Sequence, residues 1–109
     1  MFALGRGVQR DEAKAAALYK QSCDGNWLGG CKNLGAAYAD GKGVTKDESR
    51  AVTLYQQACE GGYLSACSDL AAMYAEGSGV AKDEARARTL FKRACDGGVA
   101  IACQNLQGM

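Results

Sequence analysis

Six cysteines are the residues of this 109-residue chain with the clearest capacity for chemistry. They form three pairs whose members are eight residues apart: Cys23 and Cys31, Cys59 and Cys67, Cys95 and Cys103. Paired thiols can form a disulfide, ligate a metal ion or pack as small apolar side chains. The Cys-x7-Cys spacing differs from the Cys-x2-Cys of zinc knuckles, and the chain has no histidine, so disulfides are the favoured interpretation.

Two other patterns carry polar groups that catalysis or ligand binding could use. Asp-Glu recurs at 11–12, 47–48 and 83–84, and paired carboxylates can work as general acid and base. Gly-x-Gly recurs at 5–7, 41–43 and 77–79, without the third glycine of a dinucleotide-binding loop. Because Asp is a good N-cap and Glu suits the positive end of a helix, we interpret the acidic pairs as helix caps and the glycines as turns.

The composition is that of one small, soluble domain. Hydrophobic residues make up 48% and charged residues 23%, and the net charge is +1. A general nucleic-acid binder would carry a basic excess, and none is present. The apolar runs are too short to span a membrane, and the first ten residues lack the pattern of a signal peptide.

The elements that position these residues repeat every 36 positions. When 38–73 is aligned with 74–109, 20 of 36 residues are identical, and 2–37 shares 16 with 38–73. Apolar residues at helical spacing predict a longer and then a shorter helix in each block. The predicted helices are 11–24, 28–39, 47–60, 64–75, 83–96 and 100–107. One helix pair cannot bury both of its apolar faces alone, so the blocks 2–37, 38–73 and 74–109 predict an all-α solenoid over 1–109.

The cysteine positions fit this arrangement of helices. The first cysteine of each pair lies near the end of a longer helix, and the second lies one turn into the next helix. Antiparallel helices joined by a short turn bring such positions together, so the repeat favours a bridge within each block. Disulfides of this kind persist in oxidising compartments such as a periplasm or the cell exterior.

Gly-x-Gly-Val, Asp-Glu, Ala-x-x-Leu-Tyr, Cys-x7-Cys and Leu-Gly-x-x-Tyr together resemble the Sel1-like repeat. The cysteine-bearing form is similar to the Helicobacter cysteine-rich protein family. The resemblance covers essentially the whole chain. It implies a right-handed, tetratricopeptide-like superhelix of disulfide-linked helix pairs in a periplasmic or secreted protein that binds a protein or an extended peptide. Cysteine-bearing Sel1 repeats also resemble an assembly factor of the mitochondrial intermembrane space.

One departure from the family concerns the first short helix, which has no counterpart before Phe2. We therefore expect either a fragment of a longer array or self-association through the uncovered end. The apolar residues expected to be partly exposed there are Leu4, Val8, Leu18 and Tyr19.

Members of the cysteine-rich branch often bear the names of β-lactamases or penicillin-binding proteins. A serine β-lactamase needs Ser-x-x-Lys, Ser-Asp-Asn and Lys-Thr-Gly, and none of these motifs occurs in the chain. Zinc β-lactamases need histidines, which are absent. We expect no catalysis, no cofactor and no metal. The alternative is a periplasmic binder of β-lactam or peptidoglycan fragments with at most weak hydrolysis.

In a right-handed solenoid the short helices line the concave side, so polar positions between their core residues are the expected ligand face. These positions are Lys32, Asn33, Ala36, Ser68, Asp69, Ala72, Gln104 and Asn105. Amide and carboxylate groups suit the backbone of an extended peptide, although a solvated helix face would show the same pattern. The aromatic residues at helical spacing, and Trp27 beside them, are expected to pack in the core.

Overall fold

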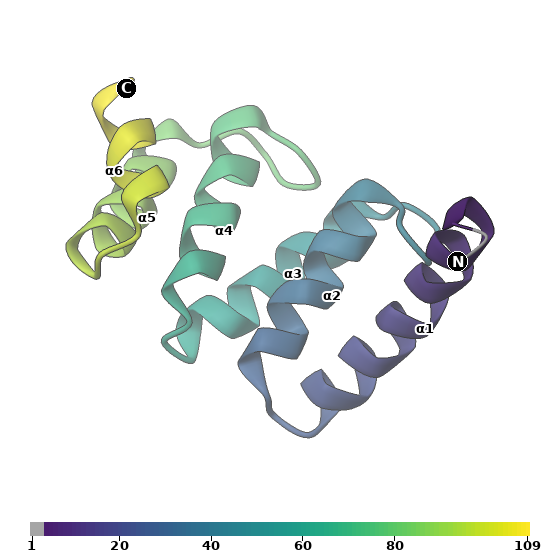
Figure 1. Cartoon of the computed structure of the whole chain (residues 1–109). Helices are drawn as coiled ribbons and strands as arrows, with labels where there is room; N and C mark the ends of the chain where they lie inside the picture. The colour runs from purple at the N-terminus through teal and green to yellow at the C-terminus, as the bar shows by residue number, and fades with distance from the viewer. Residues whose placement is uncertain (1–3) are drawn as a thin grey trace.

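The computed structural model describes residues 4–109, with side chains from residue 12 onward. All regular structure in this range is α-helical, which confirms the predicted class. The helices are α1 (Leu4–Asp24), α2 (Leu28–Asp40), α3 (Glu48–Glu60), α4 (Leu64–Glu76), α5 (Glu84–Asp96) and α6 (Ala100–Gln107). Each helix packs against the one before and the one after, and the array extends over 44 × 26 × 26 Å with its termini at opposite ends (Figure 1).

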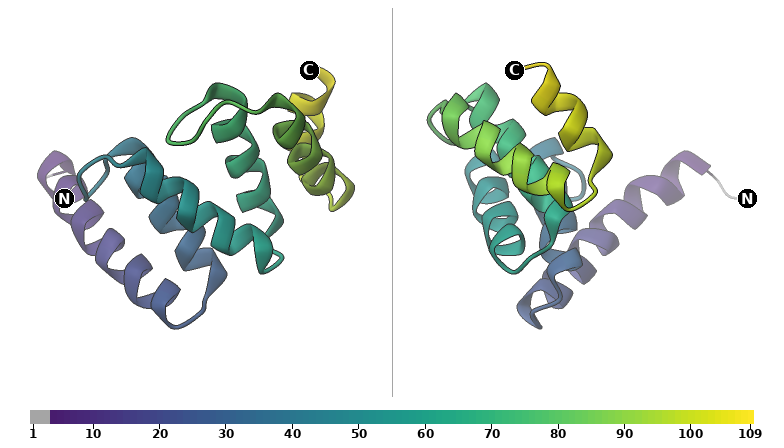
Figure 2. Two further views of the ribbon diagram at one scale, coloured as in Figure 1. Left: turned by 180° about the vertical axis from the view of Figure 1, so that it is seen from behind. Right: turned by 90° about the vertical axis from the view of Figure 1, so that its left-hand side faces the viewer.

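The two further views in Figure 2 show the same stepwise arrangement of the helices from behind and from the side. The extensive helix–helix interfaces all join helices that are adjacent in the sequence, as expected of a solenoid. None of the helices in residues 4–109 is long and apolar enough to cross a membrane.

The predicted caps explain where the helices of the second and third blocks begin and end. The side chains of Asp47 and Asp83 accept hydrogen bonds from the backbone N–H groups of Arg50 and Arg86, at 3.1 and 3.0 Å. At the other ends, α2 and α4 stop at glycines in the left-handed conformation, each with φ of 71°. The acidic pairs therefore begin helices, as the sequence predicts.

The first block differs from its prediction. Helix α1 runs without a break from Leu4, so the expected turn at 5–8 is absent and position 11 lies within the helix. In the other blocks this turn packs its second glycine on the backbone of the preceding odd-numbered helix. The backbone of residues 5–10 instead satisfies its hydrogen bonds by continuing α1. The side chains of Leu4 and Val8 lie outside the described residues.

Three disulfides join α1 to α2, α3 to α4 and α5 to α6, and all three are the predicted pairs. Their Cα–Cα distances of 4.5, 4.7 and 4.7 Å fall within the normal range. The central bridge between Cys59 and Cys67 is almost fully buried, in a core rich in alanine. Three such bridges indicate folding in an oxidising compartment.

The aromatic side chains follow the core prediction only in part. Tyr55, Tyr74 and Phe91 are buried, whereas Tyr19 and Tyr38 are half-buried. Leu18 is 60% exposed, as expected for the first helix.

The packing role expected of Trp27 is wrong, because this side chain is 60% exposed. It lies at the α1–α2 turn, where its ring covers the backbone of Gly29 and leaves much of its surface in solvent.

Candidate functional site

The even-numbered helices carry a polar residue that recurs beside an aromatic ring of the preceding odd-numbered helix. On α2, Asn33 lines a hollow of about 230 Å³ together with Tyr19 of α1. On α6, Asn105 lines a second hollow of about 230 Å³ together with Phe91 of α5. We call the surface of α2, α4 and α6 that bears these groups the even-helix face.

The equivalent pair in the middle of the array is Asp69 of α4 and Tyr55 of α3. Burial raises the pKa of the Tyr55 hydroxyl well above its ordinary value, and the charges of Asp69 and then Asp40 raise it further. The hydroxyl of Tyr55 therefore stays protonated beside these carboxylates and is available as a hydrogen-bond donor.

Among the described ion pairs, one joins neighbouring even-numbered helices, and Asp69 forms it with Lys32. Its Oδ2 atom lies 3.6 Å from the Lys32 amine of α2 and has no hydrogen-bond partner. Burial raises the pKa of the Asp69 carboxyl, and the charge of Lys32 opposes this shift only in part. The side chain is nevertheless 36% exposed, so the rest of the carboxylate faces solvent.

Most of the predicted ligand positions lie on this face. Asn33 and Ala36 share the first hollow, and Ala72 and Asn105 share the other. Lys32 and Asp69 meet between the two hollows. These six residues thus occur in sequence order along α2, α4 and α6.

Two of the predicted ligand positions behave differently. The prediction for Ser68 is wrong, because its side chain is buried with a relative exposure of 6%. Ser68 occupies the position of Lys32 in the next block, and its short side chain ends inside the packed interface, whereas a lysine can extend its amine outward. Gln104 is exposed and lines neither hollow.

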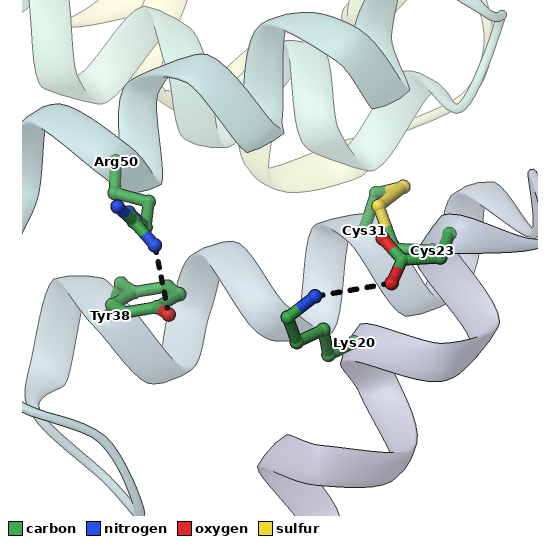
Figure 3. Close-up of polar contacts among 6 residues, drawn as sticks. Lys20, Cys23, Cys31, Tyr38 and Arg50 are labelled. Atoms are coloured by element: carbon green, nitrogen blue, oxygen red, sulfur yellow. Dashed lines mark hydrogen bonds and ion pairs between the residues drawn. A yellow bond between two sulfur atoms is a disulfide. The ribbon is translucent and has the colours of Figure 1, made fainter.

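A second pair of hollows lies between successive odd-numbered helices and was not predicted. The first Tyr–Arg groove, of about 430 Å³, lies between α1 and α3 over α2 and includes Lys20, Asp24, Tyr38, Arg50 and Gln57. In Figure 3, the Arg50 guanidinium lies over the Tyr38 ring, and Lys20 lies farther along the groove near the Cys23–Cys31 disulfide. The distance from the guanidinium carbon to the ring centroid is 5.3 Å, and Nη1 of Arg50 donates to the Tyr38 hydroxyl at 3.4 Å.

The second Tyr–Arg groove repeats this arrangement 36 residues later, between α3 and α5 over α4. It encloses about 240 Å³ and includes Gln56, Glu60, Tyr74, Arg86 and Arg93. Arg86 lies over the Tyr74 ring at 5.4 Å and donates to its hydroxyl at 3.3 Å. The sequence signal for both grooves is an arginine twelve residues after the tyrosine that ends each Leu-x-x-x-Tyr.

Within the part of the chain that the structure describes, no three or more Cys, Asp or Glu side chains gather in a way that could hold a metal ion. The linings of the four hollows include arginine, lysine, carboxylate, amide and aromatic groups.

A model of the Sel1 repeat matches residues 1–27, 30–63 and 64–99, which is most of the chain. The chain belongs to the Sel1 repeat family. The second matched segment of this Sel1 repeat chain joins α2 to α3, and the third joins α4 to α5. The family's unit is thus shifted by one helix from the 36-residue blocks that begin at Phe2.

Three solved structures share the fold of this Sel1 repeat chain. A protective antigen of uropathogenic Escherichia coli, described as displaying an SLR fold, is 31% identical with a TM-score of 0.83 over 86% of this chain. Helicobacter pylori cysteine rich protein B is 34% identical with a TM-score of 0.78 over 84% of this chain. A Sel1 repeat protein from Oxalobacter formigenes is 26% identical with a TM-score of 0.80 over 86%.

The Sel1 repeat chain is shorter than each of these proteins. It spans 20% of the E. coli antigen, 68% of the H. pylori protein and 39% of the O. formigenes protein. No curated protein sequence matches it.

Proposed function

We propose that this Sel1 repeat chain is a non-catalytic module that binds a protein, or an extended peptide segment of one, along the even-helix face. The observation that carries the proposal is the recurrence of a polar group beside an aromatic ring, at Asn33, Asp69 and Asn105. Amide and carboxylate groups can hydrogen-bond to the donors and acceptors of an extended backbone, and the rings offer apolar surface to its side chains. A receptor whose groups recur at a regular interval suits a ligand whose backbone is also regular.

The centre of the face supplies a fixed hydrogen-bond acceptor. Lys32 lies 3.6 Å from the buried oxygen of Asp69, so it orients the carboxylate and leaves the more exposed part of that group available. A backbone N–H or a cationic side chain of the ligand would donate to this carboxylate.

The size of the hollows favours a peptide over a small ligand such as a β-lactam. Each hollow of the even-helix face encloses about 230 Å³, less than the roughly 300–1,000 Å³ typical of small-molecule pockets. Contacts spread along three helices would compensate for the shallowness of each hollow.

The remaining support comes from the compartment and the relatives. Three disulfides suit a periplasmic or secreted protein. The related structures are a protective antigen and a cysteine-rich protein, and both are consistent with an exported protein that acts through its surface.

The test uses the oxidised protein to select binders from a library of extended peptides and then measures their affinity by calorimetry. The triple substitution Asn33→Ala, Asp69→Ala and Asn105→Ala should weaken binding by about tenfold or more, since it removes three hydrogen-bonding groups. The control replaces three exposed polar residues outside this face, Gln21→Ala, Ser49→Ala and Arg88→Ala, and should leave affinity unchanged. Selected peptides that bind both triple variants equally, or turnover of a chromogenic cephalosporin by the wild type, would contradict the proposal.

A further inference from the structure

The two Tyr–Arg grooves have the same construction but differ in how their cations are paired. In the first groove, the Lys20 amine lies 3.1 Å from the Asp24 carboxylate, and Nε of Arg50 lies 3.9 Å from Asp47. In the second groove, neither Arg86 nor Arg93 forms an ion pair with any carboxylate of the described residues. The second groove therefore presents two guanidinium groups without a close ion-pair partner, and the Asp83 carboxylate acts on Arg86 only from a greater distance.

These two arginines are held at a defined separation. They are seven residues apart on α5, which places them on the same side of the helix and about 10.5 Å apart along its axis. Arg86 is held by the ring and hydroxyl of Tyr74, and Nη1 of Arg93 lies 4.0 Å from Sγ of Cys59. Each contact occupies only part of a guanidinium that has five N–H donors, so both retain donors for a ligand.

The other groups of the second groove favour an anionic ligand with some apolar contact. Its apolar lining includes Leu70 and Leu90. The one carboxylate in its lining, Glu60, accepts a hydrogen bond from Gln56 at 3.2 Å. The lining thus contains two positively charged guanidinium groups and one negatively charged carboxylate, so the hollow carries a net positive charge. The carboxylate is already hydrogen-bonded to Gln56.

We infer that the second Tyr–Arg groove binds an acidic segment of a partner protein, with two of its carboxylates received by Arg86 and Arg93. Guanidinium groups form paired, charge-assisted hydrogen bonds with carboxylates. In the polyproline II conformation, which has three residues per turn and a rise of about 3.1 Å, acidic residues three positions apart lie on the same side of the chain and about 9 Å apart, close to the separation of the two arginines along α5. This site lies between α3 and α5, so it is independent of the peptide-binding function proposed for the even-helix face.

The experiment titrates oxidised, ¹⁵N-labelled protein at low ionic strength with a blocked peptide, acetyl-Gly-Ser-Glu-Gly-Ser-Glu-Gly-Ser-amide. Its counterpart with glutamine in place of both glutamates serves as the control peptide. The acidic peptide should shift the Nε–H signals of Arg86 and Arg93 and the amide signals of neighbouring α5 residues. The glutamine peptide should cause no such shifts.

Two double variants of α5 separate a specific site from general charge attraction. Arg86→Gln with Arg93→Gln removes both groove cations and should weaken binding at least about tenfold, because charge-assisted hydrogen bonds are lost. Arg88→Gln with Lys92→Gln removes the same formal charge at exposed positions that do not line the groove, and affinity should change less than about threefold. Circular dichroism melts would verify that both variants fold.

Several results would overturn the inference. Equal losses in the two double variants would show that only the overall charge matters. The absence of wild-type binding, equal binding of the glutamine peptide, or shifts confined to residues outside the groove would each contradict it. The shift map is recorded on the wild-type protein, so it remains decisive if a variant is unstable.

Discussion

Gly43 lies directly against the backbone of Glu12, so that a Cβ atom added at position 43 would overlap the Glu12 carbonyl group. The same relationship recurs one repeat later, where Gly79 lies against the backbone of Glu48. Both glycines have positive φ, at 78° and 71°. The loops before α3 and α5 are thus packed on the preceding odd-numbered helix, and this contact sets how closely successive repeats approach.

Replacing Gly79 with alanine should lower the free energy of unfolding by about 2–5 kcal/mol. About 1–2 kcal/mol would come from the left-handed backbone and about 1–3 kcal/mol from the overlap with α3. Gly62 is a matched control, because its φ is 101° but no atom lies within 4 Å of an added Cβ. Gly62→Ala should therefore show the backbone cost alone. Urea denaturation of the oxidised proteins measures both values, and equal losses would show that this packing contact contributes nothing.

Removing the central disulfide should destabilise the protein more than removing the last one. Each bridge closes a loop of the same length, for which the chain-entropy model gives about 2.6 kcal/mol. Cys59 and Cys67 are buried, whereas Cys95 and Cys103 are half-buried, so the central pair also contributes packing.

The measurement compares the urea midpoints of Cys59→Ala with Cys67→Ala against Cys95→Ala with Cys103→Ala. The midpoint of the central variant should be the lower of the two. Identical midpoints would mean that packing around the central sulfur atoms adds nothing to the effect of loop closure.

Asp69→Asn should raise stability at neutral pH. The pKa of Asp69 is raised in the folded protein, chiefly by burial, so its ionised form is less favourable there than in the unfolded chain. At pH values above this raised pKa, the charged carboxylate costs stability. As the pH falls through the raised pKa the group takes up a proton and the cost disappears.

The difference in stability between Asp69→Asn and the wild type should therefore shrink as the pH falls through the raised pKa, and should be lost below the ordinary pKa of the carboxyl group, 3.8. Thermal melts from pH 7 to pH 3 would measure it, with Asp24→Asn as an exposed control whose carboxyl pairs with Lys20. A variant that is less stable than the wild type at pH 7 would show that the attraction to Lys32 outweighs burial.

The repeat made the fold and the cysteine pairing predictable. Local signals recur in register, and the contacts of a solenoid join elements adjacent in sequence, so no distant pairing had to be inferred. The N-caps Asp47 and Asp83 and the three disulfides follow directly from residue types at fixed offsets.

The surfaces were less predictable, because they depend on the reach of individual side chains. Lys32 and Ser68 are equivalent in the repeat, yet a lysine reaches Asp69 while a serine at that position is buried. The spacing of Tyr38 assigns it to the core, whereas in the structure its ring and hydroxyl contact the guanidinium of Arg50 from the next helix. Periodicity indicates which face a residue occupies but not which neighbour its polar end contacts.

The structure begins α1 at Leu4, whereas the repeat pattern predicts a start at residue 11. Comparing substitutions at the two equivalent positions 11 and 83 distinguishes these alternatives. Asp83 caps α5 by accepting the N–H of Arg86, so Asp83→Ala should lower the free energy of unfolding by about 1 kcal/mol. Asp83→Asn retains an acceptor and should cost little. Asp11 occupies the same place in the repeat but lies inside the continuous helix α1, where alanine is the better helix former, so Asp11→Ala should be neutral or stabilising by about 0.5 kcal/mol. A loss at position 11 equal to the loss at position 83 would mean that α1 begins at residue 11, as the repeat alone predicts.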